Sequence, residues 1–78
     1  MKAYILIQTG PGRMGELVRE VSRIRGIRSA HPVTGPYDLI AQAEAPSVAA
    51  LGEGVLADIR SLFGVTKTLT CPVSDGAA

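Results

Sequence analysis

Val33-Thr34-Gly35-Pro36-Tyr37-Asp38 separates two short, largely apolar segments at the middle of the 78-residue sequence. The glycine and the proline prevent a helix or strand from continuing through this stretch. The flanking segments, residues 27–31 and 39–43, partly alternate polar and apolar side chains and carry no helix caps, which is typical of two strands joined by a loop. Because the loop also holds an acid, a hydroxyl and an aromatic ring, we expect the function to lie near it.

The length of the chain allows one domain, residues 1–78. The core of so short a chain rarely supplies more than ~3–5 kcal/mol of stability. One cysteine and one histidine exclude an internal disulfide and a cluster of zinc ligands, so we expect no metal and no cofactor. Since 46% of the residues are hydrophobic, self-association is the remaining way to stabilise the domain, and we expect a homodimer.

The net charge is +1 and the basic residues are spread along the chain, without the basic stripe of a nucleic-acid module. We therefore expect no direct DNA binding. The apolar run at residues 4–7 is too short for the core of a signal peptide or for a membrane span. A lone Cys71 fits a reducing compartment, which predicts a cytoplasmic protein.

Residues 3–8 form the first predicted strand, with Tyr4 and Leu6 on one face and Ile5 and Ile7 on the other. Apolar residues on both faces predict a central strand in a sheet that is covered on both sides. The glycine-rich residues 9–12 follow it, but they lack the ending of a P-loop and the spacing of a dinucleotide fingerprint. They are interpreted as a turn into a helix.

Two amphipathic helices are predicted. The first covers residues 13–25 and ends at Gly26, where a left-handed residue belongs. The second covers residues 48–62, and its apolar stripe is Val48, Leu51, Val55, Ile59 and Leu62. Gly52 and Gly54 inside the second helix cost ~1 kcal/mol each relative to alanine. We interpret these glycines as a place where another backbone approaches closely, with a subunit contact as one such case.

Three more strands are predicted, at residues 27–33, 39–45 and 65–73, and the tail 74–78 is expected to be frayed. In residues 27–33, strict alternation places Ile27, Ser29, His31 and Val33 on one face and Arg28, Ala30 and Pro32 on the other. Because Pro32 cannot donate to a ladder, this strand lies at an edge or carries a bulge. The last strand alternates Thr66, Thr68 and Thr70 with larger side chains.

The order strand, helix, strand, strand, helix, strand predicts an α+β, ferredoxin-like βαββαβ fold. Its antiparallel four-stranded sheet has both helices on one face. The other face carries Tyr4, Leu6 and Ile40, and no remaining part of the chain can cover it. We therefore predict that a second subunit covers this face, in a dimer packed sheet to sheet.

Three segments resemble a known family: Gly26-Ile27, Val33-Thr34-Gly35-Pro36-Tyr37-Asp38-Leu39, and Phe63-Gly64-Val65-Thr66-Lys67-Thr68. They are similar to the effector-binding domain of Lrp/AsnC transcriptional regulators, also called the RAM domain. Full members of that family carry a helix-turn-helix DNA reader ahead of this domain. Because residues 1–78 hold no such reader, the chain resembles the stand-alone form of the domain.

The resemblance implies a homodimer of the α+β-barrel type, often assembled into a ring of dimers, that binds a small amino acid between subunits. It also implies a role in transcriptional regulation through partners, a full-length Lrp/AsnC regulator being one of them. In the family, the Gly-x-x-Asp loop contributes to the effector pocket. Carried over to this sequence, the implied ligand-binding residues are Thr34, Gly35, Tyr37, Asp38, Thr66 and Thr68.

Asp38 has two interpretations: it fixes the turn by accepting backbone N–H bonds, or it orients the loop toward an amino group. Two further classes of protein share the topology. A dimeric α+β-barrel enzyme would need an inward-facing base, and His31 is the one candidate, without a nucleophile or an orienting group. We therefore expect no enzyme activity. An ACT-like amino-acid-binding module is the other class, and the Gly-x-Tyr-Asp hairpin favours the Lrp/AsnC type.

Overall fold

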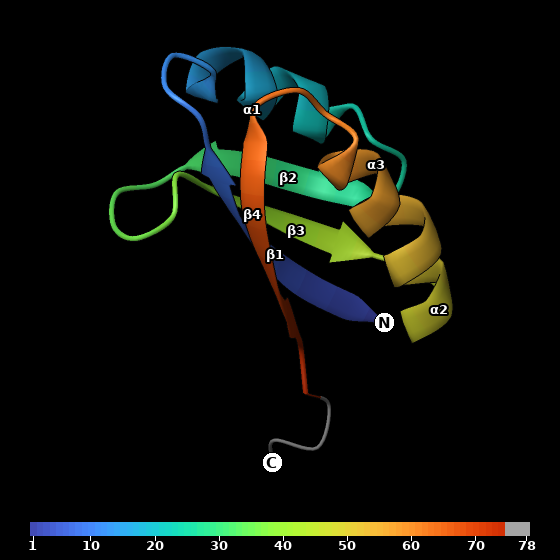
Figure 1. Ribbon diagram of the computed structural model, residues 1–78. Coiled ribbons are helices and arrows are strands. Elements are labelled where there is room, and N and C mark those ends of the chain that lie inside the picture. The colour runs from blue at the N-terminus through green and yellow to red at the C-terminus, as the bar shows by residue number, and fades with distance from the viewer. Residues whose placement is uncertain (75–78) are drawn as a thin grey trace.

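A four-stranded antiparallel sheet forms the base of the fold in the computed structural model, which describes residues 1–74 (Figure 1). Its strands are β1 (Lys2–Thr9), β2 (Ile27–Pro32), β3 (Leu39–Glu44) and β4 (Val65–Pro72). Their order across the sheet is β2-β3-β1-β4, and every neighbouring pair is antiparallel. This order confirms the ferredoxin-like prediction, with β1 at the centre and the proline-containing β2 at an edge.

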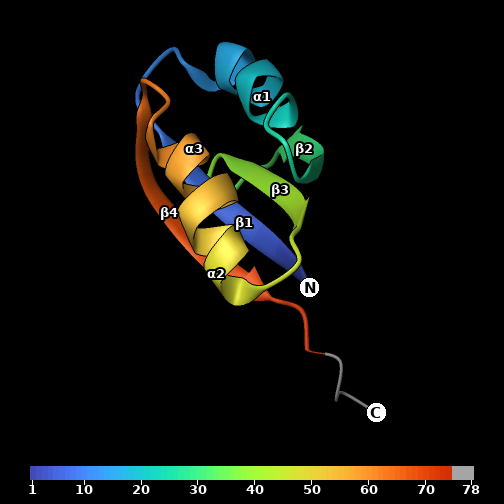
Figure 2. The ribbon, with the colours of Figure 1, turned by 90° about the vertical axis from the view of Figure 1, so that its right-hand side faces the viewer.

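Two helical segments connect the strands. The first is α1 (Met14–Ser22), and the second runs without a break through α2 (Val48–Ala50), the π-helix η1 (Leu51–Leu56) and α3 (Ala57–Arg60). α1 packs on β2 and β3, whereas the second segment contacts β3 and β4 on the same side of the sheet (Figures 1 and 2). The first helix is shorter than predicted, because after Ser22 the chain tightens into turns such as that closed by Ile24 N–H and Val21 O.

The hydrophobic core lies between the helices and one face of the sheet. Its strand residues are fully buried and follow the predicted alternation: Ala3, Ile5, Ile7, Leu39, Ala41 and Ala43. Leu17 and Val21 of α1 and Ile59 of α3 close the core from above. We call this side of the sheet the helix-covered face.

The apolar stripe of the second helix differs from the prediction at two positions. Val48 is 72% exposed, whereas Leu56, which was not assigned to the stripe, is buried beside Val55. Val55 and Leu56 lie four and three residues before the buried Ile59, so helical spacing places both on the side that faces the sheet, and both belong to the π-helix. Val48 lies in the first turn, ahead of the π-helix.

Strict alternation is also wrong at the start of β2. The register shifts between Ile27 and Ser29, so Ile27 pairs with Ala43 and packs against the core together with Ala30. A bulge inserts one residue and reverses the facing of everything before it. Ile27 therefore lies on the helix-covered face, opposite to Ser29 and His31.

Thr68 and Thr70 of β4 lie on the helix-covered face, whereas Thr66 is exposed next to a register shift between Gln8 and Thr9 of β1. Thr68 pairs with Ile7 and Thr70 pairs with Ile5, two buried residues of β1. Both threonines are half-buried, and Leu69 between them lies on the opposite face. Val65 packs against the core, so the strict alternation predicted for this strand is wrong at its start, where the register shifts.

That opposite face, which we call the open face, is the uncovered side of the sheet. Its central row crosses all four strands, as His31 pairs with Ile40, Ile40 with Leu6, and Leu6 with Leu69. The next row places Tyr4 between Gln42 and Cys71. Tyr4 is 43% exposed and Leu69 is 45% exposed. No other part of residues 1–74 covers this apolar centre, as predicted.

Beyond β4 the description stops at Ser74, so residues 75–78 of the tail that was expected to fray lie outside the described part of the chain. None of the helices in residues 1–74 combines the length and apolar character needed to cross a membrane.

Candidate functional site

The loop between β2 and β3, residues 33–38, is tied to the end of the central strand. Its own ends are closed by Val33 N–H, which donates to Asp38 O at 2.9 Å, and Asp38 N–H donates to Ile7 O at 2.9 Å. The side-chain amide of Gln8 donates to Pro36 O at 3.0 Å. Since Gln8 alternates with the buried Ile7, it stands on the open face, and the loop is therefore anchored at the rim of that face.

The carboxylate of Asp38 accepts hydrogen bonds from the end of β1. Its Oδ2 atom lies 2.8 Å from the backbone nitrogen of Thr9 and 3.3 Å from Thr9 Oγ1. These contacts satisfy a part-buried backbone N–H group, which is the structural role that the sequence left open for Asp38. Within residues 1–74, Oδ1 of the same carboxylate has no hydrogen-bond partner.

The other loop residues differ in exposure. Gly35 adopts φ +134°, and an added Cβ there would meet nothing within 4 Å, so its backbone is open to solvent. Thr34 is exposed and lines a broad apolar hollow with Met14, Pro32 and Val33. Tyr37 is half-buried.

Thr66 and Thr68 form a separate locus at the same end of the sheet. They line a hollow of about 160 Å³ together with Arg60, Val65 and Lys67. Ile7 pairs with Leu39 on one side and with Thr68 on the other, so two inter-strand spacings, about 9–10 Å, separate the loop end from β4. One chain by itself therefore does not bring the six predicted ligand-binding residues into one cavity.

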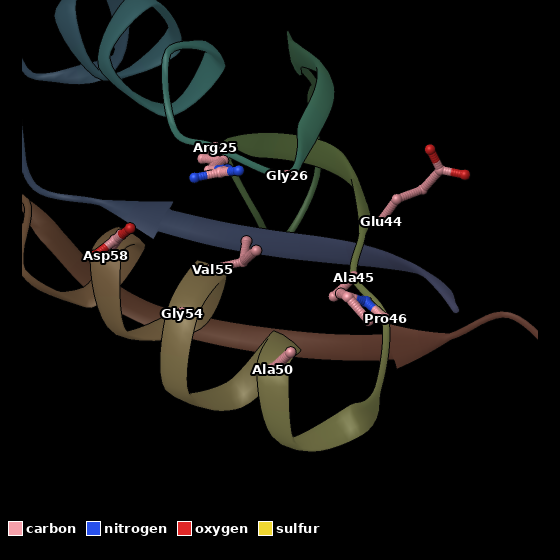
Figure 3. Close-up of a pocket in the computed structure, with 9 residues that line it drawn as sticks. All are labelled: Arg25, Gly26, Glu44, Ala45, Pro46, Ala50, Gly54, Val55 and Asp58. Carbon is pink, nitrogen blue, oxygen red and sulfur yellow. The ribbon is translucent and has the colours of Figure 1, made fainter.

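A pocket of about 390 Å³ lies at the opposite end of β3, where sequence reasoning predicted no site (Figure 3). Its walls come from the turn after α1, from the end of β3 and the turn that follows it, and from the second helix. The lining residues are Arg25, Gly26, Glu44, Ala45, Pro46, Ala50, Gly54, Val55 and Asp58.

The signal that could have found this pocket was the pair of glycines in the second helix. An added Cβ at Gly52 or Gly54 would meet nothing within 4 Å, so the expected close approach of another backbone does not occur within residues 1–74. Gly54 instead lines the pocket, beside a π-helix, a form of helix frequent at functional sites. Close packing is found at Gly26, where a Cβ would lie 2.7 Å from Val55 Cγ2.

Residues 1–74 hold no cluster of three or more side chains suited to a metal ion. His31 is exposed on the open face beside Ile40, in the position of a strand-surface residue.

The comparisons of the sequence with known proteins indicate one family. The sequence profile of the Lrp/AsnC ligand binding domain matches residues 2–75. An uncharacterized HTH-type transcriptional regulator of Pyrococcus horikoshii is 31% identical over an alignment of 71 positions, which covers 87% of this chain and 47% of that protein. The chain thus spans less than half of the length of the curated relatives that it matches.

Solved structures show the same likeness. The crystal structure of TTHA0845 from Thermus thermophilus has a TM-score of 0.89 at 30% identity, covering 99% of this chain and 96% of that one. The transcriptional regulator NMB0573 from Neisseria meningitidis, solved as a complex with L-Met, has a TM-score of 0.84 at 22% identity, over 99% of this chain and 51% of that one. The second likeness concerns the fold alone. Because the family profile matches nearly the whole chain, this protein chain belongs to the Lrp/AsnC ligand binding domain family.

Proposed function

We propose that this domain is a homodimeric effector-binding module that binds a small amino acid between its subunits, beside the loop 33–38, and acts in transcriptional regulation. The observation that carries the proposal is the position of the loop: hydrogen bonds fix it at the rim of an apolar, uncovered sheet face. A subunit packed on the open face would lie against the loop, and the two could enclose a ligand together.

The open face has the composition of a subunit interface. Its apolar centre is formed by Leu6, Ile40 and Leu69, with the amphipathic ring of Tyr4 beside them. Charged side chains stand at its margin, where Glu44 pairs with Arg28 at 2.7 Å and approaches Lys2 at 4.0 Å. An apolar centre within a polar rim is the usual anatomy of protein interfaces.

The loop offers the groups that an amino acid needs. An ammonium group calls for a carboxylate, and a carboxylate calls for N–H and hydroxyl donors. Asp38 keeps Oδ1 for the ammonium while Oδ2 holds Thr9. Gly35 exposes its backbone, and Thr34 and Tyr37 supply hydroxyls. Because Thr68 lies on the helix-covered face, Thr66 and Thr68 would add theirs only from a subunit of a neighbouring dimer. The regulator from Neisseria meningitidis was solved in complex with L-Met, which is a ligand of this chemical class.

Assembly beyond the dimer and action on DNA belong to the same proposal. Dimers joined into a ring would repeat the loop site at each junction. With a net charge of +1 and no basic stripe, residues 1–78 are expected to act on DNA through a full-length Lrp/AsnC regulator that assembles with them.

A thermal-shift screen of the standard amino acids tests the effector proposal. A ligand present at 100 times its Kd stabilises the folded state by about 2.7 kcal/mol. For a domain of this size, that gain raises Tm by roughly 10–20 °C. We expect one or a few amino acids to give such a shift, with their D-enantiomers as controls. If none of them raises Tm at millimolar concentration, the domain has no amino acid effector.

The Asp38→Asn variant separates the two roles of this side chain. The amide oxygen of asparagine can still accept from Thr9 N–H, so the fold and the oligomer should persist. The ammonium of the ligand loses its charged partner, which costs at least about 2 kcal/mol, or about 30-fold in Kd. Isothermal titration with the amino acid found in the screen measures the loss.

The matched control is Glu53→Gln, which removes one negative charge from an exposed position of η1, away from the loop. Its Kd should equal that of the parent protein. If Asp38→Asn instead loses binding only in proportion to its loss of folded protein, Asp38 is a turn residue and the ligand-binding role assigned to it is wrong.

A further inference from the structure

The pocket between the end of α1 and the second helix has a charged end and an apolar end. In Figure 3, Arg25 and Asp58 stand toward one end, Ala45, Pro46 and Ala50 stand toward the other, and Val55 lies between them. The volume, about 390 Å³, is in the range of small-molecule sites, about 300–1,000 Å³. The residues that create the space are small, and Ala50, Gly54 and Asp58 recur at a spacing of four along one side of the helix.

The two charges at the pocket are of opposite sign and are free to bind a ligand. Within residues 1–74, neither Arg25 nor Asp58 takes part in an ion pair. The third charged residue of the lining, Glu44, points away from the opening in Figure 3, and its carboxylate is held by Arg28 on the open face. The pocket therefore presents one guanidinium and one carboxylate to whatever enters it.

We infer that this pocket is a second ligand site, contained within one subunit, for a small α-amino acid with an aliphatic side chain. The planar guanidinium of Arg25 suits the ligand carboxylate, and Asp58 suits its ammonium group. The aliphatic side chain would lie on Ala45, Pro46, Ala50 and Val55. The site is independent of the loop 33–38, which lies at the other end of β3, so either site can exist without the other.

Gly54 gives the sharpest test, because filling the pocket need not harm the fold. An added Cβ at this position meets nothing within 4 Å, so a leucine side chain has room to enter the pocket. Leucine is also a better helix former than glycine, so Gly54→Leu should raise Tm by about 4–8 °C. The same variant should abolish binding at this site. Gly52→Leu is the matched control, since it makes the same exchange in the same helix outside the lining, and its affinity should be unchanged.

The probes are L-leucine and two analogues that each lack one charge, isocaproate without the ammonium and isoamylamine without the carboxylate. In titrations of the intact protein, L-leucine should move the amide NMR signals of Gly26, Ala45 and Gly54. Asp58→Asn should weaken L-leucine and isoamylamine about two- to fivefold, the range of an exposed ion pair, and leave isocaproate unchanged. Arg25→Gln should weaken L-leucine and isocaproate and leave isoamylamine unchanged, with Arg23→Gln as its control.

Three outcomes would overturn the inference. L-leucine could move only the amide signals of residues 33–38, which would show that it binds at the loop site and not in the pocket. Gly54→Leu could bind L-leucine as the parent protein does. The signals of Gly26 and Gly54 could also change with protein concentration in the absence of any amino acid, which would show that a neighbouring copy of the chain occupies the pocket. In each titration the Asp38→Asn variant should bind the same ligand at this pocket with the affinity of the parent protein. A failure of the proposed loop site would therefore leave binding at the pocket unchanged, so the two proposals can fail independently.

Discussion

The Leu6→Glu variant is expected to be monomeric at micromolar concentrations, at which we expect the parent protein to be a homodimer. Leu6 stands at the middle of the open face, with Ile40 on one side and Leu69 on the other. In a twofold dimer packed through this face, each substitution enters the interface twice. Removing a carboxylate from water costs several kcal/mol for each ion, so two of them should weaken the dimer by about 10⁴-fold or more.

Val48→Glu is the matched control, because it also replaces an apolar residue with glutamate. Val48 is 72% exposed and lies in the first turn of α2, where a negative charge suits the helix N-terminus. Its helix packs on the other side of the sheet, so the variant should remain dimeric. Native mass spectrometry and light scattering report the oligomeric state of both variants, and circular dichroism reports whether each is folded.

The concentration dependence of Tm tests the dimer even if Leu6→Glu does not fold. For the parent protein, Tm should rise with protein concentration, because dissociation and unfolding are coupled. A Tm that stays constant between micromolar and millimolar protein, together with a monomeric mass, would show that the open face is not a subunit interface.

The sequence contained enough information to predict the arrangement of the sheet. Alternation placed Ile5 and Ile7 on one face of β1 and Tyr4 and Leu6 on the other, and the structure keeps that division. The uncovered face could be predicted because two helices of this length cover one side of a sheet only. Pro32 likewise predicted that β2 lies at an edge or carries a bulge, since proline cannot donate to a neighbouring strand, and β2 does both.

Registers and local helix geometry could not be predicted in the same way. The bulge between Ile27 and Ser29 depends on how β2 pairs with β3, so it leaves no mark in the alternation of β2 alone. The π-helix at Leu51–Leu56 leaves no mark in the spacing of the apolar residues, and the predicted stripe missed Leu56, which is buried beside Val55 and three residues before Ile59. The face of the sheet on which Thr68 lies is likewise fixed by its pairing with Ile7, so β4 alone could not predict it.

The sequence predicted the loop 33–38 itself, whereas its role as a ligand site stays a prediction. Asp38 was recognised as the acid of the loop, but its bond to Thr9 joins residues 29 positions apart and follows from the tertiary fold. Thr66 and Thr68 stand across β1 from the loop, so they can share a ligand with Asp38 only where subunits meet. Gly54 was unusual in the sequence because glycine destabilises the interior of a helix, and in the structure it lines a pocket.

Gly26→Ala is expected to remove about 2–5 kcal/mol of folding stability, which is most of what a core of this size supplies. Gly26 adopts φ +98°, a region that costs a residue with a Cβ about 1–2 kcal/mol. The new Cβ would also lie 2.7 Å from Val55 Cγ2 and 3.0 Å from Glu44 O. Gly26 O in turn accepts from Glu44 N–H at 2.8 Å, so the backbone cannot move away without breaking that bond.

Gly15→Ala makes the same exchange in α1 and should have the opposite sign. Gly15 is not among the glycines with positive φ, and an added Cβ there meets nothing within 4 Å. Alanine should therefore stabilise the protein by about 0.4–1 kcal/mol, chiefly by restricting the unfolded chain. Urea unfolding at one fixed protein concentration compares the two variants with the parent. Equal unfolding midpoints for Gly26→Ala and the parent would contradict the close contact between Gly26 and Val55. The turn after α1 would then not form a wall of the pocket in the way that this contact implies.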